Sequence, residues 1–114
     1  MTQNRNKLID LFIGNISNSV VHEILEKAID NEEISKRYEK ESATSFEIAK
    51  RYREKINPVN LSLPRNNIEY IKTKINNKVR VELIIRISKG YKGINLDLID
   101  GIIDKHLRKM KIMN

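Results

Sequence analysis

The hydrophobic pattern of the first thirty residues predicts an amphipathic helix. Over residues 5–29 the apolar positions recur at steps of three and four, which is typical of a helix with a wide apolar stripe. Gly14-Asn15 lies inside this stretch and permits either a kink or a break. Asp30 then predicts the cap of a new helix, with Glu33 as its capping-box partner. The stripe of the first helix consists of Leu8, Ile9, Phe12, Ile13, Ile16, Val20, Val21, Ile24, Leu25 and Ala28.

Residues 32–56 repeat a helical pattern with a polar middle, and they permit two interpretations. The first is one long helix packed antiparallel on the preceding one. The second is a helix-turn-helix, because Thr44 and Glu47 form a second capping box that would start a helix at Ser45. Asn57-Pro58 ends the region in both cases. The apolar positions are Ile34, Tyr38, Phe46, Ile48, Ala49, Tyr52 and Ile56.

After Pro58 the apolar period changes from helical to alternating. Residues 59–63 alternate as a short strand does, and a turn follows at residues 64–67. Residues 68–88 then predict a β-hairpin around Asn76-Asn77-Lys78, with an apolar inner face and a basic outer face. A helix over residues 68–87 is the alternative, but the density of β-branched residues favours the hairpin. The inner face would carry Ile71, Thr73, Ile75, Val79, Val81, Leu83, Ile85 and Ile87.

The last segment predicts a helix that begins after Asn95. Asp97 lies in its first turn and His106, Arg108 and Lys109 lie in its last, which suits the helix dipole. Its apolar stripe is formed by Leu96, Ile99, Ile103 and Met110, widened by Ile102 and Leu107. The sequence therefore predicts one α+β domain over residues 1–114. It would contain an N-terminal helical pair, an antiparallel two- or three-stranded β-meander and a C-terminal helix.

Charge adds a second observation, because it is confined to one half of the chain. The net charge is +7, residues 1–57 are balanced, and residues 58–114 carry twelve Lys or Arg against five Asp or Glu. This asymmetry indicates an anionic partner for the second half. The leading hypothesis is a non-enzymatic, cytoplasmic nucleic-acid-binding protein that uses the outer face of the hairpin. Its contact residues would be Tyr70, Lys72, Lys74, Lys78, Arg80, Arg86, Lys89 and Lys92.

The broken form of residues 32–56 would add a recognition helix. In outline it resembles a winged helix-turn-helix, with Lys50, Arg51 and Arg53 facing DNA and the hairpin as the wing. The segment departs from that motif in lacking the glycine of the tight turn. Lys40 also stands where an apolar turn residue is expected.

Few residues suggest other chemistry. The chain has no cysteine and only two histidines, so no nucleophile and base can be paired, and no metal or cofactor is expected. Asp97, Asp100 and Asp104 form an acidic ridge, and Asp104 has Arg108 as an ion partner four residues on. The loop of residues 89–93, KGYKG, could hold a phosphate on its backbone amides.

A rival hypothesis is protein interaction. The stripe of the first helix is wider than a chain of this length easily covers, so that helix would dock on a partner or form a homodimer. No apolar run is long enough to span a bilayer and the N-terminus does not resemble a secretory signal, so no membrane partner is expected.

Overall fold

Four α-helices and one 3₁₀ turn form the regular structure in residues 4–58 and 61–113, which the computed structural model describes. Within those residues no strand is present, so the predicted α+β fold with its β-meander is wrong. The helices are α1 (Arg5–Ala28), α2 (Glu32–Ile56), α3 (Arg65–Ser88) and α4 (Ile99–Lys109), and the 3₁₀ turn η1 (Leu96–Leu98) leads into α4.

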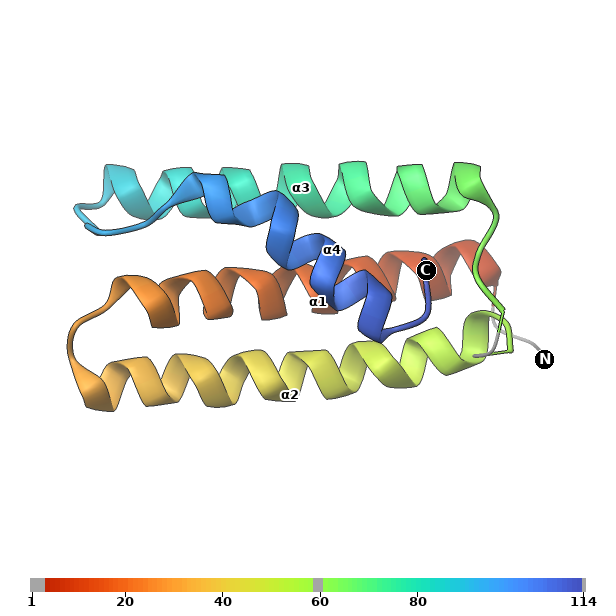
Figure 1. The fold of residues 1–114 in the computed structure, drawn as a ribbon, viewed down its shortest axis with the longest axis horizontal. Helices are drawn as coiled ribbons and strands as arrows, with labels where there is room; N and C mark the ends of the chain where they lie inside the picture. Colours follow the sequence, from red (N-terminus) through yellow and green to blue (C-terminus); the bar gives the residue numbers. More distant parts are fainter. Residues whose placement is uncertain (1–3, 59–60, 114) are drawn as a thin grey trace.

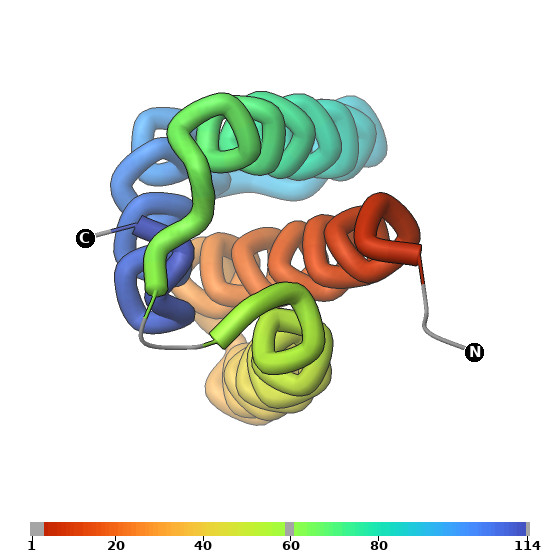
Figure 2. The backbone as a smooth tube through the Cα atoms, turned by 90° about the vertical axis from the view of Figure 1, so that its right-hand side faces the viewer, coloured from red at the N-terminus to blue at the C-terminus, as the bar shows by residue number. Residues whose placement is uncertain are grey.

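The three long helices lie side by side, with α1 in the middle (Figure 1). Helix α2 runs antiparallel to α1, whereas α3 runs parallel to it, and the short helix α4 crosses α1 obliquely. Seen along the long axis, α4 covers one side of the α1 and α3 pair and leaves the opposite side open (Figure 2). The candidate functional site lies on this side of the α1 and α3 pair.

Helix α1 is confirmed and is the centre of the core. Asn4 caps it by accepting a 2.8 Å hydrogen bond from the Asn6 amide. The helix continues through Gly14-Asn15 without a break. All of its predicted stripe except Ala28 is buried against the other helices. A docking or dimerisation surface on this helix is therefore wrong, because its apolar side chains already have partners within the chain.

Helix α2 is one continuous helix of 25 residues, which confirms the first of the two interpretations, and the alternative with a turn and a recognition helix is wrong. Its cap is Asn31 rather than Asp30, since the Asn31 side chain accepts from the Ile34 amide at 3.0 Å. Its polar middle does not break the helix because most of it faces water. The exception is Ser42, which forms reciprocal hydrogen bonds of 2.8 and 2.9 Å with Ser19 and lets α1 and α2 approach closely.

The predicted hairpin of residues 68–88 is a helix. Ile71, Ile75, Val79 and Leu83 are each completely buried, and their spacing of four places them on one side of α3. Positive φ angles occur at Gly90, Gly93 and Lys111 but not at residues 76–78, so no tight hairpin turn exists there. Packing of this stripe on α1 overrides the β preference of the branched side chains.

The chain end returns to the core. Asn95 is a cap, as predicted, and its side chain accepts from the Asp97 amide at 2.9 Å at the start of η1. The predicted strand of residues 59–63 is not formed at 61–63, and Val59 and Asn60 lie outside the described residues. Leu63 is buried and its amide donates to the Ile112 carbonyl at 3.2 Å. Among the described residues, no helix is both long and apolar enough to cross a membrane.

Candidate functional site: the α1–α3 groove

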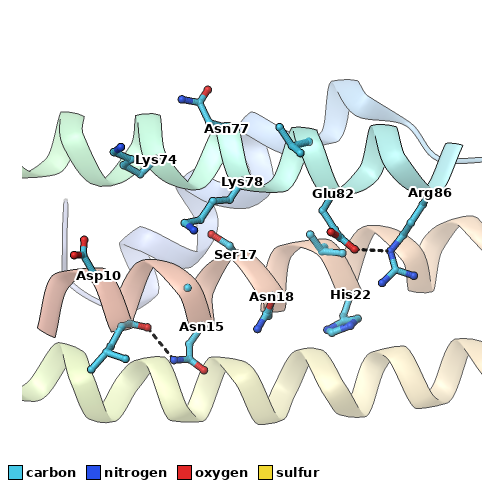
Figure 3. A pocket seen from close by; sticks show the side chains of 14 residues that line it. Asp10, Asn15, Ser17, Asn18, His22, Lys74, Asn77, Lys78, Glu82 and Arg86 are labelled. Atoms are coloured by element: carbon cyan, nitrogen blue, oxygen red, sulfur yellow. Dashed lines mark hydrogen bonds and ion pairs between the residues drawn. The ribbon is translucent and has the colours of Figure 1, made fainter. Parts of the chain in front are cut away.

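A groove of about 790 Å³ runs between the parallel helices α1 and α3. The side chains that line it come from α1 and α3 (Figure 3), and α4 contributes none of them. It exists because α3 packs through one narrow stripe while α1 presents short side chains such as Gly14, Ser17 and Asn18. We call this hollow the α1–α3 groove. It is lined by Asp10, Leu11, Gly14, Asn15, Ser17, Asn18, Val21, His22, Lys74, Asn77, Lys78, Val81, Glu82 and Arg86.

One end of the α1–α3 groove is closed by a network of paired side chains. Arg86 donates to Glu82 at 3.2 Å and lies over the Tyr91 ring at 5.5 Å. His22 lies 3.2 Å from a Glu41 carboxylate oxygen and stacks on Tyr38. Burial lowers the pKa of His22, and the nearby Glu41 carboxylate only partly opposes this effect. The charged groups at this end are therefore already engaged.

The other end and the middle of the groove differ, because two lysines there have no carboxylate partner within residues 4–58 and 61–113. At the end, the Tyr70 hydroxyl contacts Asp10 at 3.4 Å, and the Lys74 ammonium lies 5.7 Å from the centre of the Tyr70 ring. Neither Lys74 nor Lys78 forms an ion pair in the described part of the chain. Figure 3 shows the Lys78 side chain reaching from α3 toward α1 near Ser17. Like charges four residues apart on a helix repel each other, so this pair favours a bound anion.

Gly14 forms part of the groove floor and no packing requires it. A Cβ added there would meet nothing within 4 Å, and its φ is not in the left-handed region. A glycine inside a helix costs about 0.5–1 kcal/mol relative to alanine. No close contact between helices compensates for this cost. The missing side chain at Gly14 leaves space in the groove beside Ser17.

The predicted nucleic-acid contacts do not form one face, because on a helix they point in different directions. Lys72 turns toward α4 and lies 3.1 Å from Asp104, while Arg80 contacts Asn76 at 3.4 Å. Lys89 and Lys92 are exposed beyond the end of α3. Only Lys74, Lys78 and Arg86 line the α1–α3 groove, and Tyr70 lies beside it. Nucleic-acid binding by a basic hairpin face is therefore wrong, because that face does not exist.

The three residues predicted for the recognition helix do not lie on one exposed face. Lys50 and Arg51 are exposed on α2, whereas Arg53 is 1% exposed. Its Nε donates to the Met110 carbonyl at 2.8 Å, and its Nη2 donates to Leu61 and Lys111 at 2.8 and 3.0 Å. Burial lowers the pKa of Arg53. Arg53 is a structural residue that is not accessible to DNA.

The remaining candidates have structural partners. Asp104 pairs with Lys72 instead of Arg108, and Asp100 accepts from Asn76, so these two residues of the acidic ridge join α4 to α3. No group of three or more potential metal ligands occurs in the described residues. In the KGYKG loop, a Cβ on Gly93 would lie 2.9 Å from the Ala28 carbonyl oxygen. This close approach, together with a φ of +80°, accounts for the glycine.

His106 was expected in the last turn of a helix; it lies there, and it is also buried 2.9 Å from Glu23 of α1, a contact that the sequence did not indicate. The groove residues of α1 were also missed by sequence reasoning. A signal for them existed: Gly14, Asn18 and His22 follow one another at steps of four within an apolar helix. Lys74 and Lys78 share that spacing on α3. Comparisons with protein-family models, curated proteins and solved structures found no match to this chain.

Proposed function

We propose that this chain is a non-enzymatic, cytoplasmic binding protein that holds a small diphosphate-bearing ligand in the α1–α3 groove. The observation that carries the proposal is the pair Lys74 and Lys78, which lies on the groove wall with no carboxylate partner among the described residues. Their Cβ atoms are roughly 6 Å apart, as expected for residues on successive helical turns. Two flexible ammonium groups at that spacing suit two adjacent phosphoryl groups.

The other groove residues limit where the anion lies. Arg86 is occupied by Glu82 and Tyr91, and Asp10 repels negative charge at the opposite end. The diphosphate is therefore placed in the middle, above Gly14 and Ser17. The side-chain amide of Asn18 is one further hydrogen-bond donor on the α1 side of the groove. The rest of the ligand extends along the groove, whose volume lies within the range of small-molecule sites.

Titration of inorganic diphosphate into ¹⁵N-labelled protein tests the site. We expect saturable shifts of the Gly14, Ser17, Lys74 and Lys78 amides. The double variant Lys74→Gln/Lys78→Gln should bind at least about tenfold more weakly. The control variant Lys50→Gln/Lys55→Gln makes the same change in net charge on α2, and Lys55 also lies over a tyrosine ring, at 5.8 Å. Equal losses in both variants would contradict the proposal.

A second variant tests the groove without touching its charges. Gly14→Leu adds a side chain into open space and improves helix propensity by up to about 1 kcal/mol. We expect diphosphate affinity to fall while the melting temperature does not. Gly101→Leu on α4 is the matched control, since its Cβ also meets nothing within 4 Å.

An oligonucleotide titration distinguishes the source of the phosphate. Shifts at Lys74 and Lys78 with single-stranded oligothymidylate, but none with diphosphate, would overturn the small-molecule proposal. Absence of shifts with either probe would also overturn it.

A further inference from the structure

The outward face of the last two turns of α3 carries an exposed aliphatic patch. Val81, Ile84, Ile85 and Ile87 are 58, 49, 41 and 41% exposed. The spacing of Val81, Ile84 and Ile85 by three and four residues makes these side chains neighbours on the helix surface, and Ile87 is three residues beyond Ile84. We call these four residues the α3 patch.

The α3 patch is not an ordinary scatter of surface hydrophobics. The other large hydrophobic side chains exposed to this degree in the described residues are separated from one another. Ile34 lies on α2, Leu61 in the α2–α3 connection and Tyr70 near the start of α3. Four branched aliphatic side chains within seven residues form a continuous surface, and such surfaces in soluble proteins mark sites of interaction.

Charge around the α3 patch defines the partner. Lys78 and Arg80 precede it and Lys89 and Lys92 follow it, and none of these four forms an ion pair in the described chain. The nearby carboxylate, Glu82, is held by Arg86 at 3.2 Å. The rim of the patch is therefore cationic at both ends.

We infer that the α3 patch docks an amphipathic helix of another protein whose apolar stripe is flanked by acidic side chains. A helix packs on a helix through apolar residues at i, i+3 and i+4, which is the spacing of the patch. Acidic flanks then meet the cationic rim, which steers association and selects the partner. A second copy of this chain would instead bring another cationic rim and a further charge of +7 to the interface.

This docking surface is distinct from the α1–α3 groove, although Val81 belongs to both and Lys78 lies on the groove wall as well as at the rim of the patch. Ile84 and Ile87 do not line the groove and are therefore the residues to change. The probe is a synthetic amphipathic helix of about four turns, with leucines at i, i+3, i+4 and i+7 and glutamates beside them. A matched peptide has lysines in place of the glutamates.

We expect the acidic peptide to bind the wild-type protein saturably by fluorescence anisotropy, and the basic peptide to bind at least about tenfold more weakly. Ile84→Ser/Ile87→Ser should weaken binding of the acidic peptide about tenfold or more, because two apolar contacts are lost. Ile34→Ser, on an exposed position of α2, should change it less than about twofold. Diphosphate affinity should be the same in all of these variants. A failure of the docking inference can therefore be distinguished from a failure of the diphosphate proposal for the groove.

Other outcomes overturn the inference. Equal affinity for the two peptides would show that charge does not select the partner. No saturable binding of the acidic peptide would remove the docking site. Sedimentation of the wild type as a dimer, and of Ile84→Ser/Ile87→Ser as a monomer, would assign the patch to self-association. Binding to anionic vesicles that the acidic peptide cannot displace would assign it to a lipid surface.

Discussion

At the scale of single residues, Arg53 joins three segments that are distant in the sequence. Its guanidinium donates to carbonyl groups of the α2 end, the α2–α3 connection and the chain end, and its charge has no carboxylate partner in the described residues. An arginine suits this position because its planar fork supplies five donors in fixed directions. Its donors add to the backbone hydrogen bond that the Leu63 amide makes to the Ile112 carbonyl between two of these segments.

Replacement of Arg53 should therefore destabilise the protein strongly. We expect Arg53→Met to lower the free energy of unfolding by roughly 3 kcal/mol, because several buried carbonyl groups lose their donor. Arg51→Met, the same change at an exposed position two residues earlier, should alter it by less than about 0.5 kcal/mol. Urea unfolding measures both values. Similar small effects at the two positions would show that the Arg53 hydrogen bonds are not needed.

At the scale of elements, the contact between α1 and α4 depends on a partly buried polar cluster. Glu23 of α1 accepts hydrogen bonds from both Lys105 and His106 of α4, and the His106 ring also meets Phe46 of α2 edge-on. The hydrogen bond from His106, aided by Lys105, lowers the pKa of Glu23 from 4.5 to about 2. The carboxylate is thus a fixed part of the α1–α4 interface.

This cluster predicts a pH dependence of stability. A carboxylate whose pKa is depressed by folding stabilises the fold above its unfolded pKa. Its contribution should therefore be present above pH 4.5 and be lost as the pH falls toward about 2. Glu23→Gln should lower the free energy of unfolding at pH 7 and flatten its dependence over that interval. Glu26→Gln is the control, because Glu26 is an acid of α1 that forms no ion pair with the residues that the structure describes. An unchanged pH profile in Glu23→Gln would contradict this role.

At the scale of the whole molecule, the chain end completes the core. Ile112 is fully buried and Met110 nearly so, and both lie beyond the last helix. They sit against the α2–α3 connection, where the Ile112 carbonyl accepts from the Leu63 amide. The α2–α3 connection and the last described residues are held together in this way, so residues that belong to no helix contribute to global stability.

Shortening Ile112 tests this contribution. We expect Ile112→Ala to cost about 2–4 kcal/mol, as large-to-small changes in a core do. Met113→Ala, at the partly exposed neighbour, should cost less than about 1 kcal/mol. Thermal and urea unfolding provide the comparison. A small effect at Ile112 would mean that the chain end does not pack as described.

Some of this protein was predictable from the sequence alone. The helical spacing of the apolar stripe in residues 5–29 continues on both sides of Gly14-Asn15, and α1 is one unbroken helix. The cap at Asn95 was also predictable, because a capping side chain bonds to a backbone amide two residues away and needs no distant partner. The positive charge of the second half was predictable too, because it follows directly from the residue composition.

Only the tertiary structure decided the rest. The sequence pattern of residues 68–88 is compatible with both a hairpin and a helix. The helix forms because it packs one apolar stripe on α1, which consists of Ile71, Ile75, Val79 and Leu83. That choice turns Lys72 toward Asp104, leaves Lys78 at the groove and exposes the α3 patch. Local preferences of β-branched residues are worth less than about 1 kcal/mol each, whereas burial of a complete aliphatic side chain is worth about 1.5–3 kcal/mol. The partner helix therefore determines both the secondary structure of this segment and the surface available for function.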